Sequence, residues 1–199
     1  MRSDLERVLF DEPAIHRRLD EMAAQILNDY RQRELTVIAV LNGSLMFMAD
    51  LLRRIPLPLK LDCLSVVSYH EKAQTSGKVI FKFATSNPST RAGKLSDGGQ
   101  VALPDVVGRD VLILDDILDS GHTLVAICEK LKAAKPRSMR VCVLLSKKKQ
   151  RARQVDADYV GFEIEDEFVV GYGLDFMGRY RNLPYIGVLR KELLEQSSR

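Results

Sequence analysis

The chain has 199 residues, enough for one domain with a substantial core. Its 46% hydrophobic and 29% charged residues are typical of a globular protein, and a net charge of +3 is too small to indicate nucleic acid on its own. No apolar run approaches the ~20 residues that cross a bilayer, and the N-terminus lacks the apolar stretch of a signal peptide. We therefore expect a cytoplasmic protein with no membrane partner and no nucleic-acid partner.

The predicted elements alternate along the chain. Apolar residues recur at steps of three and four from 13 to 33, which predicts an amphipathic helix starting near Pro13. A run rich in β-branched residues at 36–41 predicts a strand buried on both faces, with a helix following to about residue 54. Further strands are predicted at 60–69, 78–85, 110–114, 140–145, 159–162, 168–172 and 185–189, with a helix at 123–134. This order indicates an α/β fold with a mostly parallel sheet.

The most informative segment is Val111-Leu-Ile-Leu-Asp-Asp-Ile-Leu-Asp-Ser-Gly-His-Thr123. Ligands of open α/β sheets bind at the carboxyl ends of strands, which is where Asp115 and Asp116 are expected. A helix that starts within Ser120–Thr123 would offer free amide donors and a positive dipole end to a phosphate. Two carboxylates beside a phosphate site suit a sugar phosphate. A simple capped helix with acids in its first turn is the alternative.

Two other nucleotide-binding classes are excluded by the same residues. The chain has no G-x-x-x-x-G-K-[ST] motif, and it has no G-x-G-x-x-G after a strand. We therefore predict neither a P-loop nor a dinucleotide fold. Asp119 lies inside the acidic turn, where its carboxylate could reach a reacting base.

This segment resembles the signature of type I phosphoribosyltransferases, and of their hypoxanthine-guanine branch in particular. Four further stretches agree in order and spacing: Leu41-Asn-Gly-Ser44, Ser68-Tyr69, Lys147, and Phe168-Val-Val-Gly-Tyr-Gly-Leu-Asp175 with Arg181. The resemblance implies a single domain over residues 1–199 with a central, mostly parallel twisted sheet flanked by helices. It also implies a small base-binding hood built by the N- and C-terminal segments. A mobile lid would span about residues 70–108, where glycine and proline suggest an insertion.

The resemblance assigns a role to each position of the phosphoribosyl site. The ribose and its 5′-phosphate would be held by Asp115, Asp116, Ser120, Gly121, His122 and Thr123. The pyrophosphate would meet Asn42, Gly43 and Arg181, with a cis Leu41–Asn42 peptide between the first strand and the turn. Mg²⁺ would be held by Asp175 with Asp115 and Asp116. The branch often has glutamate at the first of these acids, so the shorter Asp115 side chain is a departure.

The remaining roles concern the base and the lid. Asp119 would be the general acid or base at the purine N7, and Lys147 would donate to the purine O6. Phe168 would stack on the base, and Val169 would offer backbone groups to its edge. Ser68 and Tyr69 would start the lid.

The implied reaction belongs to purine salvage. The phosphoribosyl group of 5-phosphoribosyl-1-pyrophosphate (PRPP) would pass to N9 of hypoxanthine or guanine, giving IMP or GMP and pyrophosphate, in a homodimer or homotetramer. One alternative is an enzyme that prefers xanthine. Another is an inactive nucleic-acid-binding regulator of the same fold, for which the basic run at 147–153 is the support.

Overall fold

The computed structural model describes residues 1–68, 79–84 and 104–196, with side chains described for 1–65 and 104–196. Its main sheet has six strands in the order β4-β3-β2-β5-β6-β7. The strands are β2 (Leu35–Leu41), β3 (Leu59–Ser68), β4 (Val79–Ala84), β5 (Asp110–Leu118), β6 (Ser138–Lys147) and β7 (Tyr159–Ile164). All neighbours pair in parallel except β4, which is antiparallel to β3. The predicted parallel α/β sheet is therefore confirmed.

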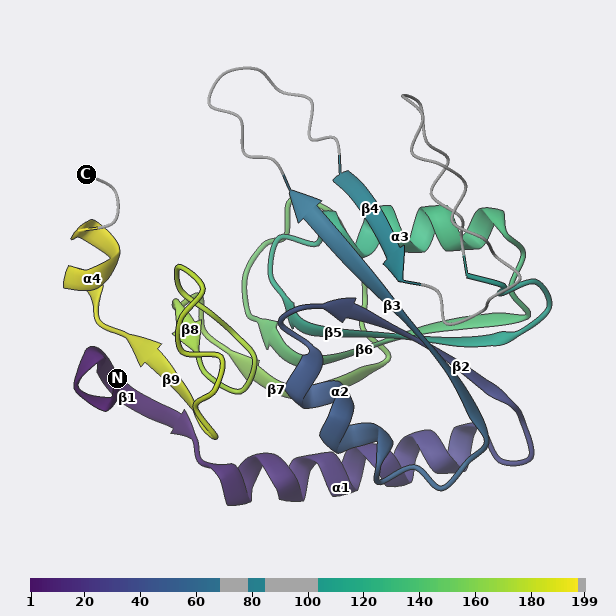
Figure 1. Cartoon of the computed structure of the whole chain (residues 1–199), viewed down its shortest axis with the longest axis horizontal. Helices are drawn as coiled ribbons and strands as arrows, with labels where there is room; N and C mark the ends of the chain where they lie inside the picture. Colours follow the sequence, from purple (N-terminus) through teal and green to yellow (C-terminus); the bar gives the residue numbers. More distant parts are fainter. Residues whose placement is uncertain (69–78, 85–103, 197–199) are drawn as a thin grey trace.

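A second, smaller sheet joins the two ends of the chain. It has the order β1-β9-β8, with both pairs antiparallel. Its strands are β1 (Leu5–Phe10), β8 (Val169–Val170) and β9 (Ile186–Leu189). Figure 1 shows the purple N-terminal strand beside the yellow C-terminal strand, to one side of the main sheet. The resemblance implied a hood built by these two ends of the chain, and this small sheet is where they pair.

Helices cover both faces of the main sheet. α1 (Glu12–Asp29) and α2 (Leu45–Leu52) lie on one face and α3 (His122–Ala133) on the other, as Figure 1 shows. The described chain also contains the short helix η1 (Arg2–Asp4) and the terminal helix α4 (Lys191–Gln196). α1 begins as predicted, because the Asp11 carboxylate accepts a hydrogen bond from the Ala14 amide at 2.9 Å. None of the described helices combines the length and apolarity that crossing a membrane requires.

Alternating side chains of the central strands divide the core in two. On β2 and β5, Val37 and Leu112 pack toward α1 and α2, whereas Ile38 and Ile113 pack toward α3. All four are fully buried. A strand buried on both faces loses the polar alternation of a surface strand, which is why these segments read as continuous apolar runs. The carboxyl ends of β2 and β5 therefore lie side by side between the two helix layers.

Several predicted boundaries were wrong. β5 continues through the acids to Leu118, and the expected strand at 168–172 shrinks to Val169–Val170 because Gly171, Tyr172 and Gly173 all adopt positive φ. The loop prediction also fails at its end, where Val106 is fully buried against the α3 layer. β1 and α4 were not predicted. The rest of the lid prediction, at 69–78 and 85–103, lies outside the described residues.

Candidate active site

A cavity of about 290 Å³ opens at the carboxyl ends of β2 and β5, beside the start of α3. Nine of the residues that line it have roles assigned by the resemblance: Gly43, Asp115, Asp116, Asp119, Ser120, Gly121, Thr123, Asp175 and Arg181. The cavity also has an apolar lining, to which no role was assigned, from Val40, Leu41, Ile117, Leu118 and Leu124. Segments more than a hundred residues apart in the sequence thus meet around one space.

The floor of this cavity carries two adjacent carboxylates near the end of β5. Asp115 is 6% exposed and accepts a hydrogen bond from the Asp116 amide at 3.0 Å, while Asp116 accepts from the Ile117 amide at 2.9 Å. Burial, and then the neighbouring Asp116 charge, raises the pKa of Asp115 well above its usual value. Burial also raises the pKa of Asp116. The pair is therefore poorly solvated, and backbone amides are its hydrogen-bond donors within the described part of the chain.

The turn from Asp119 to Gly121 packs against a loop that is distant in the sequence. Gly121 has φ +83°, a region that favours glycine, and a Cβ there would lie 2.3 Å from the Arg153 carbonyl oxygen. The Arg153 amide in turn donates to the Ser120 carbonyl at 3.1 Å. Gly121 precedes the first residue of α3, so the free amides at this helix start point toward the cavity end of the turn. Such an end binds anions.

Two close backbone approaches shape the opposite wall. A Cβ on Gly43 would lie 1.7 Å from Oδ2 of Asp116, and a Cβ on Gly173 would lie 2.0 Å from the Gly43 carbonyl oxygen. Gly173 also has φ +103°. The Leu41–Asn42 peptide before this turn is cis, as the resemblance implied. The Leu41–Ser44 turn therefore fits between the β5 acids and the loop after β8 only because both contact positions lack a side chain.

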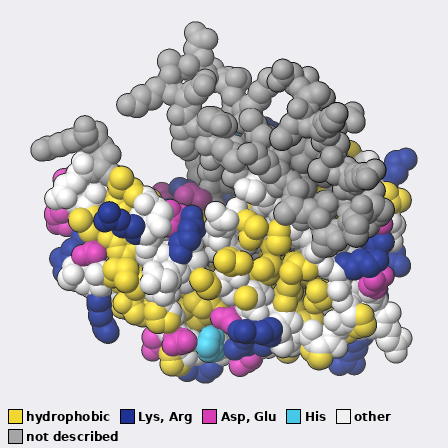
Figure 2. Space-filling view, viewed as in Figure 1, with side chains coloured by type: hydrophobic (Ala, Val, Ile, Leu, Met, Phe, Trp, Pro, Cys, Tyr) yellow, Lys and Arg dark blue, Asp and Glu magenta, His cyan; other side chains and the backbone are white. Residues whose placement is uncertain are grey.

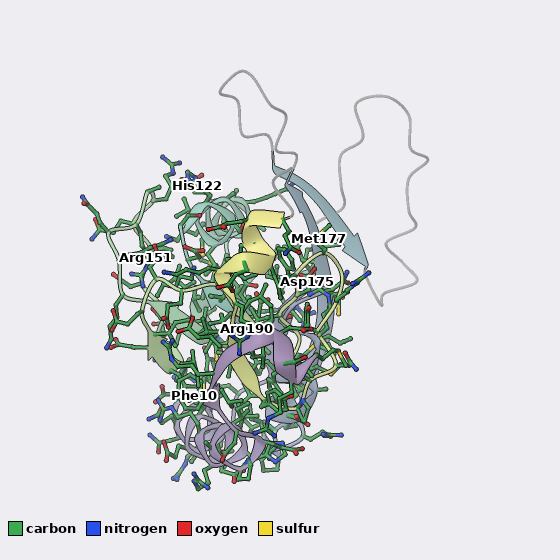
Figure 3. All side chains as sticks on the ribbon, turned by 90° about the vertical axis from the view of Figure 1, so that its left-hand side faces the viewer. Phe10, His122, Arg151, Asp175, Met177 and Arg190 are labelled. Atoms are coloured by element: carbon green, nitrogen blue, oxygen red, sulfur yellow. The ribbon has the colours of Figure 1, made fainter. Side chains whose placement is uncertain are left out.

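Asp175 and Arg181 face the cavity as an ion pair. Arg181 Nη2 lies 2.7 Å from Asp175 Oδ1, and Arg181 Nη1 donates to the Gly173 carbonyl at 2.6 Å. Asp175 also accepts from the Gly178 amide at 2.8 Å. Figure 3 shows Asp175 in this loop, well separated from His122 at the start of α3. Both side chains are half-buried, so a substrate can reach them.

A preassembled metal cage is absent from the described chain. No three His, Cys, Asp or Glu side chains among its residues lie close enough together to hold a metal ion by themselves. The expected set of Asp175 with Asp115 and Asp116 is thus not a ready three-carboxylate site. These acids nevertheless fit Mg²⁺ bound partly through substrate oxygens, because they share a cavity with an anion-binding turn and the buried β5 pair would gain from a cation.

The predicted base-binding residues lie beside the cavity rather than in its lining. Lys147, the last residue of β6, is 9% exposed and places Nζ 3.2 Å from Asp119 Oδ2. Phe168 is 41% exposed and meets Phe176 edge to face, with ring centroids 5.5 Å apart. Val169 is buried in β8. An exposed aromatic ring beside a buried lysine suits a flat ligand with a polar edge.

The remaining predicted residues lie outside the cavity lining or have side chains that are not described. His122 is exposed and, with Asn42, lies outside the cavity lining. Ser68 ends β3, and its side chain lies outside the described set, as does all of Tyr69. Sequence reasoning missed Lys149 and Asp166, which both contact residues of the site. The basic run was visible in the sequence, but nothing local indicated which of its lysines turns inward.

Comparisons with known proteins agree with this geometry. The family model for the phosphoribosyl transferase domain matches residues 8–177. A hypoxanthine-guanine phosphoribosyltransferase of Staphylococcus epidermidis is 42% identical over 193 residues, covering 97% of this chain and 98% of that protein. Its Bacillus subtilis counterpart is 40% identical over 197 residues, covering 98% and 99%. A solved hypoxanthine phosphoribosyltransferase of Staphylococcus aureus superposes with a TM-score of 0.83 at 38% identity, covering 97% and 96%.

Proposed function

The chain belongs to the phosphoribosyltransferase family, and from this premise we propose that it transfers the phosphoribosyl group of PRPP to N9 of hypoxanthine or guanine. The products are IMP or GMP and pyrophosphate, which makes this an enzyme of purine salvage. One observation carries the proposal. A buried carboxylate, a half-buried one and a helix-start turn with free amides share one cavity of about 290 Å³, which is the arrangement a ribose 5-phosphate needs.

The ribose phosphate is bound by residues of β5 and the turn after it. The amides and hydroxyls of Ser120–Thr123 donate to the 5′-phosphate, and Gly121 allows the backbone to approach it. The ribose hydroxyls donate to Asp115 and Asp116. These donors stabilise the ionised carboxylates, so sugar binding offsets the cost of burying two adjacent charges.

The pyrophosphate leaves from the side of the cavity opposite this turn. The backbone at Asn42 and Gly43 and the Arg181 guanidinium provide donors for it. Asp175, with Asp115 and Asp116, would hold Mg²⁺, which when bound supplies positive charge to the departing pyrophosphate. Because the sugar carbon gains cationic character as its bond to oxygen breaks, positioning and electrostatics supply most of the rate acceleration.

The base binds between the hood and the end of β6. Phe168 stacks on the purine, the Val169 backbone meets its edge, and the Lys147 ammonium donates to O6. Asp119 takes or gives the proton at N7, since it lies at the mouth of the cavity and 3.2 Å from the Lys147 ammonium. Most of the lid that the resemblance places from Ser68 and Tyr69 onward lies outside the described residues.

Three broader proposals accompany this reaction. Residues 1–199 act as a single domain that works in the cytoplasm. The chain assembles as a homodimer or homotetramer, for which the exposed Leu45 (45%) and Met46 (38%) of α2 provide apolar contact surface. Figure 2 shows apolar side chains gathered over this part of the molecule. Light scattering after gel filtration measures the assembly, and a monomer at micromolar concentration would contradict it.

The test of the reaction is product formation from PRPP and Mg²⁺ with hypoxanthine, guanine or xanthine in turn. Transfer to hypoxanthine or guanine supports the proposal, a strong preference for xanthine would change the base assignment, and no reaction with any of them would refute it. Asp119→Ala should lower kcat by roughly 10²–10⁴ with a modest effect on binding, if this carboxylate moves the N7 proton. Unchanged turnover would assign the proton transfer to another group.

The basic run at 147–153 gives little support to a nucleic-acid-binding role. Lys147 and Lys149 both pair with Asp119 and Asp166, and Arg153 lies 3.9 Å from Glu129. Paired charges release fewer counterions from a nucleic acid than free ones, so this surface is weakly suited to phosphate-backbone contacts.

A further inference from the structure

Four alternating charges form a cluster that includes Asp119 of the cavity lining. Lys147 Nζ lies 3.2 Å from Asp119 Oδ2 and 3.0 Å from Asp166 Oδ1. Lys149 Nζ lies 3.1 Å from the same Asp166 oxygen and forms a short ion pair with Asp119 Oδ1. The proposed reaction uses Lys147 and Asp119 but gives no role to Lys149 or Asp166. Each carboxylate is therefore shared by two ammonium groups, and the ring is neutral.

Substrate binding would alter this balance. When Lys147 donates to the carbonyl oxygen of the base, its hydrogen bond to Asp166 and its ion pair with Asp119 weaken, because an ammonium has only three donors. Asp119 then depends on its second cation for charge balance and orientation. Lys149 contacts the other oxygen of that carboxylate, so it can stay in place while Lys147 turns to the substrate.

The backbone around Lys149 is fixed well enough for such a role. Arg151 Nη2 donates to Ser146 Oγ at 2.8 Å, and the Arg153 amide donates to the Ser120 carbonyl at 3.1 Å. These contacts fix the segment after β6 against the turn that contains Asp119. The Lys149 side chain is 28% exposed, and the neighbouring Asp119 and Asp166 carboxylates raise its pKa, so it is charged at neutral pH.

We propose that Lys149 is a positioning residue that holds the Asp119 carboxylate oriented for proton transfer at the base while Lys147 is engaged by the substrate. Asp166 supports it by holding both ammonium groups through one oxygen. This inference rests on the proposed function, because it assumes that Asp119 serves the base. It adds a residue that acts on the chemical step without touching the ribose or the phosphates.

The experiment compares three variants in steady-state transfer from PRPP to hypoxanthine. Lys149→Met removes the charge and keeps the length of the side chain, and Lys149→Arg restores a cation. Lys148→Met is the matched control, since Lys148 is the adjacent lysine and lies 3.6 Å from the exposed Glu165, away from Asp119. Thermal melting of each variant checks that it is folded.

Loss of one partly exposed ion pair that acts in the transition state should lower kcat about three- to tenfold. We expect this in Lys149→Met, with kcat/KM for hypoxanthine falling equally and the KM for PRPP unchanged. Lys149→Arg should recover most of the rate, and Lys148→Met should match the wild type.

Three results would overturn the inference: a loss in Lys149→Met smaller than threefold, an equal loss in Lys148→Met, or an effect confined to the KM for PRPP. An inactive wild-type enzyme would instead refute the proposed function, so the two failures can be told apart.

Discussion

Gly43→Ala tests the tightest contact in the site. The new Cβ would lie 1.7 Å from Oδ2 and 2.5 Å from Cγ of Asp116, so the carboxylate must withdraw by more than about 1 Å to reach ordinary contact distance. Gly43 does not have positive φ, which means that the cost arises from the contact and not from backbone strain. The withdrawal also weakens the 2.9 Å hydrogen bond from the Ile117 amide.

The expected effect is large on activity and moderate on stability. A displacement of about 1 Å in a substrate-binding group lowers kcat/KM by about 10²-fold, and the KM for PRPP should rise because ribose binding is the role proposed for Asp116. Weakening one buried charged hydrogen bond should lower the unfolding free energy by about 1–3 kcal/mol. Steady-state kinetics and thermal melting measure the two effects.

Gly108→Ala is the matched control. Gly108 has φ +66°, and a Cβ added there would meet no described atom within 4 Å, so alanine should lower stability by about 1 kcal/mol through strain and leave kinetics unchanged. If Gly43→Ala kept kcat/KM within about threefold of the wild type, Asp116 would not be a group whose position the reaction needs.

Three further outcomes are expected. Asp115→Asn should abolish most activity yet raise the unfolding free energy of the ligand-free protein at pH 8 by about 1–2 kcal/mol. Since burial raises the pKa of Asp115, the wild type loses stability as the pH rises through that pKa, and the gain should vanish near pH 4; a variant less stable at pH 8 would contradict this. Phe168→Leu should raise the KM for hypoxanthine about tenfold with little change for PRPP, because stacking on a base contributes about 1–3 kcal/mol; an unchanged KM would exclude the stacking role. Arg137→Met should leave activity intact but lower the unfolding free energy at pH 7, because Asp110 is fully buried and the Arg137 hydrogen bond lowers its pKa. Solvent screening moderates the loss, since the Arg137 side chain is 59% exposed. That stabilisation is present above the unfolded pKa of about 3.8 and is lost as the pH falls through the lowered pKa, so the difference that chemical denaturation measures at pH 7 should become smaller at pH 3.

The segment from Val111 to Thr123 shows what the local sequence pattern predicts correctly and what it misses. Its continuous apolar run predicted a buried strand, and its acids and small polar turn predicted a ligand site at the strand end, which the cavity matches. The strand nevertheless continues to Leu118, because parallel pairing with β6 extends to Ser146 and holds the acids in the sheet. Pairing of that kind depends on the neighbouring strand and cannot be seen in the segment itself.

The small sheet of β1, β9 and β8 was largely not predictable from local sequence. Val169–Val170 pairs with Val188 and Gly187, and β1 pairs with the same strand from the far end of the chain. Only six residues of β1 form this contact, without a strong alternating pattern to indicate it. The predicted strand at 168–172 was therefore too long, since the glycines at 171 and 173 bend the chain toward the Leu41–Ser44 turn.

The sequence alone determined the elements whose cause is local. Apolar runs and helical spacing set β2, β5, α1 and α3, and adjacent acids with a small polar turn marked the end of β5 at which the cavity opens. The tertiary structure decided which distant groups meet. Gly43 lies against Asp116, Gly173 against Gly43, and Lys149 against Asp119. These approaches depend on how two helix layers and a second sheet pack around the strand ends, and packing is a property of the whole chain that no local window of sequence contains.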